Sequence, residues 1–206
     1  MHFEFLVEEL SAEVVLYNVV PKIIGNNITF CVHSHQGKAD LLGKLPGRLR
    51  GYKAWLPDEW KIVVLVDVDS EDCLSLKARI NNMALEAGLK TKSRVQNMGQ
   101  IQFLSRLAIE ELEAWFFGDV DAHIAAYPRI SPHLGSKERF RNPDTIIGGT
   151  WESLERVLKR QRYHLEGLPK VQAARDISIH MDPERNRSQS FRVFRQGLLE
   201  LAGLST

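Results

Sequence analysis

Acidic residues follow three apolar segments of this chain, and each segment has the residue pattern of a β-strand. Glu8 follows the first segment, and Asp67 and Asp69 follow the second. Glu110 and Glu113 follow the third. The carboxyl ends of parallel strands meet at one edge of a sheet, so we expect these side chains to lie close together. Carboxylate oxygens suit Mg²⁺ or Mn²⁺, and sites of this kind cleave phosphodiester bonds.

The spacing of two between Asp67 and Asp69 sends both side chains the same way from an extended strand end, so both could reach one cation. Glu8 is then either a third metal ligand or the group that handles a proton. A competing explanation is that Asp69 or Ser70 caps the helix that follows. Capping does not explain Glu8 at the end of the first strand, which favours the metal site.

Glu110 and Glu113 are one helical turn apart, so at least one of them is expected to face the site and to assist catalysis. The dipole of the following helix is a second explanation for acidic residues at its start.

Polar residues 33–38 are predicted to form a loop after the second strand, at the same edge. We expect Lys38 to contact phosphate and His33 or His35 to donate a proton to the substrate. The alternative is a polar loop in which Gly37 makes a turn. The two histidines lack two further obvious partners, which argues against zinc.

The elements that position these residues follow from hydrophobic patterning, which predicts strands at residues 3–8, 28–32, 61–66 and 101–109. Helical patterns alternate with these strands, and the one at residues 39–56 is interrupted near Pro46. The alternation predicts an α/β fold with a Rossmann-like parallel sheet flanked by helices over residues 1–127. Residues 128–206 are predicted to form a C-terminal, mostly helical extension packed on that sheet.

The composition of the chain indicates the cellular compartment in which the protein works. Cys31 and Cys73 fit no disulfide framework or metal-ligand spacing, which indicates a reducing, cytoplasmic location. The N-terminus lacks the basic start of a signal peptide, and no apolar run is long enough to span a bilayer. Motifs for ATP hydrolysis by a P-loop or for dinucleotide binding are missing from the sequence.

The C-terminal part of the chain is mildly basic, whereas the part that carries the acidic clusters is mildly acidic. Arg185 and Arg187 precede a predicted helix, where they are expected to hold the phosphate backbone of a nucleic acid. A solvated basic surface is the alternative.

Two segments resemble the Toprim fold of topoisomerases, primases and overcoming-lysogenization-defect nucleases: residues 5–13 and residues 64–69. The resemblance implies that Glu8 matches the catalytic glutamate and that Asp67 and Asp69 match the pair that binds Mg²⁺. This chain departs from that pattern at Glu9, where many members have glycine.

The whole chain more closely resembles the bacterial family labelled domain of unknown function 4276, through residues 33–41, 109–116, 148–152 and 180–188. Members resemble components of mobile-element and phage-defence neighbourhoods, which implies an ATPase partner protein.

We therefore expect a Mg²⁺- or Mn²⁺-dependent nuclease of Toprim type that acts on nucleic acid. The main alternative is a non-catalytic, Toprim-like adaptor or sensor subunit that binds an ATPase. A third alternative is a primase-like nucleotide-binding protein. The sequence leaves open whether the substrate is DNA or RNA, and whether the chain forms a dimer.

Overall fold

A parallel sheet forms the centre of the protein in the computed structural model, which describes residues 1–92 and 100–204. It has four strands in the order β2-β1-β3-β4. The strands are β1 (His2–Val7), β2 (Thr29–Ser34), β3 (Trp60–Asp67) and β4 (Phe103–Ala108). The predicted α/β fold, with a parallel sheet flanked by helices and a helical C-terminal part, is confirmed.

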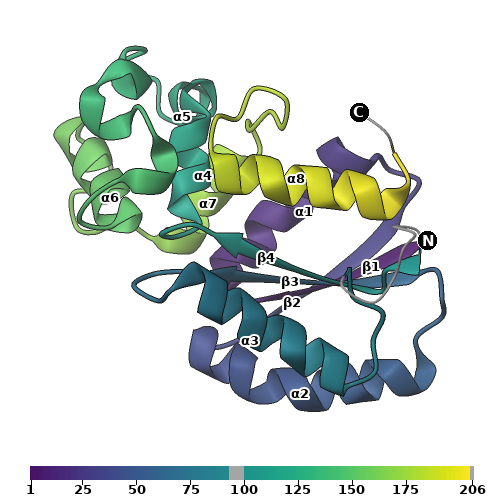
Figure 1. Ribbon diagram of the computed structural model, residues 1–206. Coiled ribbons are helices and arrows are strands. Elements are labelled where there is room, and N and C mark those ends of the chain that lie inside the picture. Colours follow the sequence, from purple (N-terminus) through teal and green to yellow (C-terminus); the bar gives the residue numbers. More distant parts are fainter. Residues whose placement is uncertain (93–99, 205–206) are drawn as a thin grey trace.

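Helices cover both faces of the sheet (Figure 1). They are α1 (Leu10–Ile24), α2 (Lys38–Trp55), α3 (Cys73–Glu86), α4 (Glu113–Gly118), α5 (Val120–Ala126), α6 (Thr150–Arg160), α7 (Lys170–Ser178) and α8 (Gln189–Ala202). Helices α2 and α3 lie on one face, whereas α1 and α8 lie on the other with α7 packed against α1. The segment from α4 to α6 extends beyond the carboxyl ends of the strands, at the left of Figure 1.

Strand β3 is apolar on both faces because helices cover both. Val63 and Leu65 belong to the core beneath α1 and α8. Ile62, Val64 and Val66 belong to the core beneath α2 and α3. This double burial fixes the register of β3 and therefore the position of the residues that follow it.

The predicted interruption near Pro46 is wrong, because α2 runs through this proline without a break. Leu41, Leu45 and Leu49 are fully buried at spacings of four, so one face of the helix packs on the sheet along its length. That packing outweighs the hydrogen bond that proline cannot donate.

The C-terminal helices share a hydrophobic core with the sheet. Phe5 of β1, Val15 of α1, Trp115 of α4 and Phe194 of α8 all belong to one buried cluster. No helix in the described part of the chain is long and apolar enough to cross a membrane.

Candidate functional site

Strand pairing brings Glu8 and Asp67 together at the carboxyl edge of the sheet. Strands β1 and β3 are neighbours, with Val7 beside Leu65 in the register. Glu8 follows Val7, and its Oε1 accepts a hydrogen bond of 2.8 Å from the backbone N–H of Asp67. The carboxylate of one strand end is therefore held against the backbone of the other.

The carboxyl groups of Glu8, Asp67 and Glu113 all have raised pKa values. Burial raises the pKa of Glu8 to about 7, although a hydrogen bond from Asp67 and the charge of Lys38 oppose it. Burial also raises the pKa of Glu113 to about 7, against the charge of Lys170. The pKa of Asp67 lies well above its ordinary value because of burial and then the charges of Glu113 and Glu8. We call these three carboxyl groups the acidic cluster. In the described part of the chain none of them forms a direct ion pair, and the charges of Lys38 and Lys170 offset the effect of burial only in part.

Asp69 faces a lysine. Its Oδ2 lies 2.6 Å from Nζ of Lys38, and about half of its side chain is exposed. Lys38 also contacts Glu71 at 3.3 Å and donates to the backbone carbonyl of Val68. Lys38, which the sequence predicts to contact phosphate, therefore stands at the acidic edge and is neutralised by two carboxylates.

Two non-glycine residues at this edge have left-handed backbone conformations. Asp69 has a φ of 51° and Glu110 has a φ of 62°. They are joined by a hydrogen bond of 2.8 Å from the N–H of Asp69 to the carbonyl of Glu110. Such conformations are costly for side chains like glutamate and gather at functional sites.

Glu111 has a structural role. Its Oε2 accepts hydrogen bonds of 2.8 Å from Thr150 Oγ1 and from the backbone N–H of Trp151, which caps α6. Glu113 is the residue of this segment that joins the acidic cluster, and it is only 3% exposed. Glu110 contributes a backbone carbonyl and keeps a half-buried side chain.

The sequence did not reveal Lys170 as part of this site. Lys170 begins α7, far along the chain, and its Nζ lies 3.7 Å from Oε1 of Glu9 and 5.0 Å from the ring centre of Trp151. Burial of Lys170 disfavours its charged form, but the negative charges of Glu113 and Glu9 keep its pKa above the ordinary value. No motif marks this lysine, because it arrives only when α7 packs on α1.

His33 does not lie in a loop, contrary to the prediction. Strand β2 extends to Ser34, and His33 pairs with Leu6 in the register. Its Nε2 lies 2.6 Å from Oε2 of Glu4, which also accepts a hydrogen bond from Tyr52. The strand continues past the apolar run because β1 offers it backbone partners up to Val7. His33 therefore belongs to a network in the middle of the strands.

His35 does lie beside the carboxyl edge. Its Nδ1 is 2.9 Å from the carbonyl oxygen of Val7. Its Nε2 is buried and has no hydrogen-bond partner among the described residues. Burial lowers the pKa of this imidazole, which favours its neutral form.

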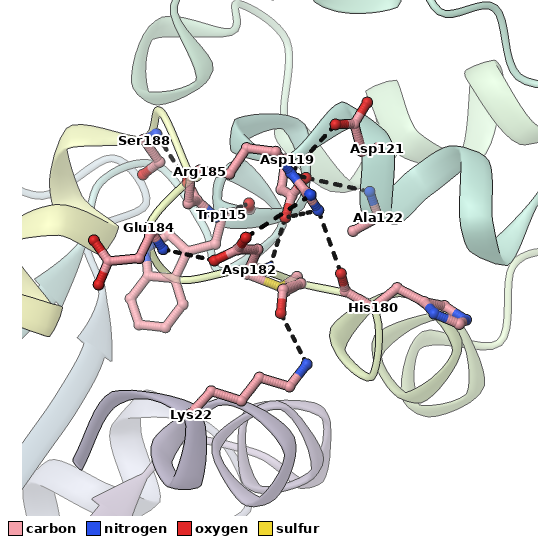
Figure 2. Close-up of polar contacts among 12 residues, drawn as sticks. Lys22, Trp115, Asp119, Asp121, Ala122, His180, Asp182, Glu184, Arg185 and Ser188 are labelled. Atoms are coloured by element: carbon pink, nitrogen blue, oxygen red, sulfur yellow. Dashed lines mark hydrogen bonds and ion pairs between the residues drawn. The ribbon is translucent and has the colours of Figure 1, made fainter. Parts of the chain in front are cut away.

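Arg185 is held in an ion-pair network with residues outside the acidic cluster, and Figure 2 shows these contacts. Its Nε and one Nη donate to the two carboxylate oxygens of Asp119 at 2.8 and 3.0 Å. Asp121 and Asp182 lie at 3.4 and 3.9 Å from the guanidinium group. Lys22 of α1 donates to the backbone carbonyl of Met181 at 2.8 Å. The guanidinium predicted to hold phosphate thus has the bidentate geometry of a structural clamp.

Neighbouring residues strengthen this clamp. Asn186 is fully buried and donates to the carbonyl of Trp115 at 2.8 Å. Ser188 caps the N-terminus of α8. The backbone N–H of Arg187 donates to the carbonyl of Gly118 at 2.9 Å, whereas its side chain is exposed. Segment 180–188 therefore ties α4 to α8.

The donor chemistry of the acidic cluster fits a divalent cation, because its carboxylate oxygens are buried or half-buried and only partly offset by Lys38 and Lys170. In the described part of the chain, however, no three or more His, Cys, Asp or Glu side chains are arranged so that they could hold an ion. Metal binding would therefore need side-chain rotation at the cluster.

Comparison with known proteins places the chain in a family. Neither the curated proteins nor the solved structures give a match. A family model described as "Domain of unknown function (DUF4276)" matches residues 7–199, which include the acidic cluster and the Asp119–Arg185 clamp. The chain therefore belongs to the DUF4276 family.

Proposed function

We propose that the protein is a Mg²⁺- or Mn²⁺-dependent nuclease of Toprim type, with its catalytic site at the acidic cluster. The observation that carries this proposal is the convergence of Glu8, Asp67 and Glu113 from separate segments, each with a pKa raised by burial. Structural carboxylates are normally paired with cations, whereas catalytic sites gather groups with perturbed pKa values.

Asp67 and Glu113 would hold the cation, with Asp69 or Glu110 assisting from the left-handed turns beside them, and Glu8 would either complete the set of ligands or handle a proton. The bound ion would activate water and offset charge on the leaving oxygen. With a pKa of about 7, a Glu8 side chain that does not bind the ion can accept and release a proton near neutral pH. Lys38 stands at the same edge and would supply positive charge toward a phosphate group once Asp69 turns from it to the cation.

The decisive experiment measures cleavage of labelled DNA and RNA with Mg²⁺ or Mn²⁺ present. Replacing Asp67 with Asn should lower the rate at least about 100-fold, because the change removes a charge that the reaction needs while keeping the shape of the side chain. Equal cleavage by the wild type and Asp67→Asn would refute the proposal.

A matched control is available at the opposite end of the same strand. Asp58 precedes β3, is largely exposed and lies 3.4 Å from Lys90. Asp58→Asn makes the same chemical change at the amino edge and should cleave like the wild type. A parallel loss in both variants would mean that the assay reports general charge effects and not the acidic cluster.

A non-catalytic adaptor that binds an ATPase is the second candidate, and exposed apolar residues in the C-terminal part favour it. Ile147, Leu165 and Ile179 are 88%, 62% and 56% exposed. Large apolar side chains in water are common at protein contacts. Size-exclusion chromatography with an ATPase encoded beside this protein, together with calorimetry of Mn²⁺ binding, separates the two candidates: an adaptor forms the complex and binds no metal.

A further inference from the structure

A groove of about 970 Å³ runs along β4, the edge strand of the sheet. Residues of β4 form its floor, and α3 and α8 form its two walls. In Figure 1, β4 lies at the edge of the sheet between α8 on one face and α3 on the other. This groove, which we call the β4 groove, lies apart from the residues of the acidic cluster.

Cations outnumber carboxylates in the β4 groove, whose charged lining residues are Lys77, Lys92, Arg106, Arg192, Arg195, Glu184 and Glu200. Arg195 forms an ion pair with Glu184. Lys92 lies 3.9 Å from Glu200. The remaining cations of the lining are Lys77, Arg106 and Arg192. In the part of the chain that the structure describes, these three have no ion-pair partner, so the groove carries uncompensated positive charge.

Arg106 is the most confined of these cations. Its Nε donates to the carbonyl of Val193 on α8 and its Nη1 to the carbonyl of Ser105, both at 3.0 Å. It packs so closely on Gly197 that a side chain there would collide with its guanidinium. Burial lowers the pKa of Arg106. Burial also lowers the pKa of Lys77, followed by the charges of Arg106 and Lys92. Partly buried like charges are costly unless an anion joins them.

The contacts of Arg106 also decide what kind of anion fits. On the outer edge of β4, the Ser105 carbonyl already accepts a hydrogen bond from Arg106, and Phe103 is bridged to Thr91, which disfavours the addition of a peptide strand. Asn81, Ser105 and Gln196 add polar side chains to the lining. Cations spaced along a groove with neutral polar groups between them match the repeated phosphates of a nucleic-acid backbone.

We propose that the β4 groove binds the phosphate backbone of a single-stranded nucleic acid, which deepens the proposed function by naming the path of its substrate. A single strand can enter a groove where Arg106 and Lys77 lie partly buried, whereas the phosphates of a duplex would meet only its exposed rim. The groove also leads toward the acidic cluster. Ala108 pairs with Asp67, and Arg106 lies two residues, or ~7 Å, before it on β4.

The test measures binding without cleavage, by fluorescence anisotropy of a labelled single strand of about 15 nucleotides in the presence of EDTA. The double variant Lys77→Gln/Arg192→Gln, which removes two cations without an ion-pair partner in the described residues, should bind at least about tenfold more weakly at low salt. The slope of log affinity against log salt should fall by roughly 0.7 for each cation removed. Arg50→Gln/Lys53→Gln removes the same charge from α2, outside the groove, and should leave the slope unchanged.

The outcomes separate this inference from the nuclease proposal. If Asp67→Asn binds like the wild type and only the groove variant loses affinity, the β4 groove is the binding path, whether or not cleavage is found. If the groove variant binds like the α2 control, or if the wild type binds duplex or an acidic peptide but no single strand, the groove assignment is overturned. Cleavage that needs Asp67 would stand in either case.

Discussion

Replacing Glu113 with Gln is expected to stabilise the metal-free protein by about 3 kcal/mol near pH 8. The pKa of Glu113 rises from 4.5 to about 7 on folding. Between these values the folded state binds more protons than the unfolded state, so stability falls as pH rises through this window. Above it the folded protein holds a buried charge, which glutamine lacks. The same substitution should change stability little below the lower value, where both states are protonated.

The test compares the free energies of unfolding of the wild type and Glu113→Gln, measured with urea in EDTA near pH 8 and below the pKa of 4.5. Glu110→Gln is the matched control, because its side chain is only half-buried and it stands three residues earlier in the same segment. It should alter the free energy of unfolding by less than about 0.5 kcal/mol at either pH. A Glu113→Gln variant that is less stable than the wild type near pH 8 would show that this carboxylate is adequately paired, and the metal proposal would lose its main support.

The Glu113→Gln variant also tests whether the acidic cluster binds a divalent cation. Near pH 8 a divalent ion would add positive charge beyond that of Lys38 and Lys170 at the acidic cluster, so Mn²⁺ at about 100 times its dissociation constant should stabilise the wild type by about 2.7 kcal/mol. Glu113→Gln should lose most of that gain. Because protons and the ion compete for the same carboxylates, the gain should shrink as pH falls toward 5.

The sheet could be predicted from the sequence because its strands are strongly patterned. The apolar run Ile62 to Val66 signals a strand that is covered on both faces, and the acidic residues that close it mark the carboxyl edge. The boundary at His33 could not be predicted, since β2 continues only because β1 offers it hydrogen-bond partners. Likewise, Pro46 is tolerated in α2 because of burial that no local pattern reveals.

The candidate site was only partly predictable. Glu8 and Asp67 approach each other because their strands are neighbours, which chain order and strand pattern suggest. Lys170 and Glu9 meet through the packing of α7 on α1, and the sequence carries no signal of that contact. The motif around Arg185 looked basic and exposed, yet its partner Asp119 comes from a turn 66 residues earlier. A charged residue in a sequence is therefore a poor indicator of a binding site until the structure shows which residues it pairs with.

Asp119→Ala should destabilise the protein by about 2 to 4 kcal/mol, because it leaves two backbone N–H groups without their acceptor and removes a charged hydrogen bond. The Asp119 side chain is fully buried, whereas that of Arg185 is 42% exposed. Its carboxylate accepts both bonds from Arg185 and also the backbone N–H groups of Ala122 and Asp182 (Figure 2). Alanine leaves these backbone donors without a partner, and, among the described residues, segment 180–188 is then hydrogen-bonded to α4 only through Asn186 and Arg187.

Asp121 is a close control for this substitution. It lies two residues away and contacts the same Nε of Arg185 at 3.4 Å, but its side chain is 66% exposed. Asp121→Ala should therefore cost less than about 1 kcal/mol. The double variant Asp119→Ala/Arg185→Ala should cost less than the sum of its two single variants, because each single change already breaks the shared pair. Equal urea midpoints for Asp119→Ala and Asp121→Ala would mean that the clamp does not hold the fold, and Arg185 would then again be free to act as a phosphate-binding residue.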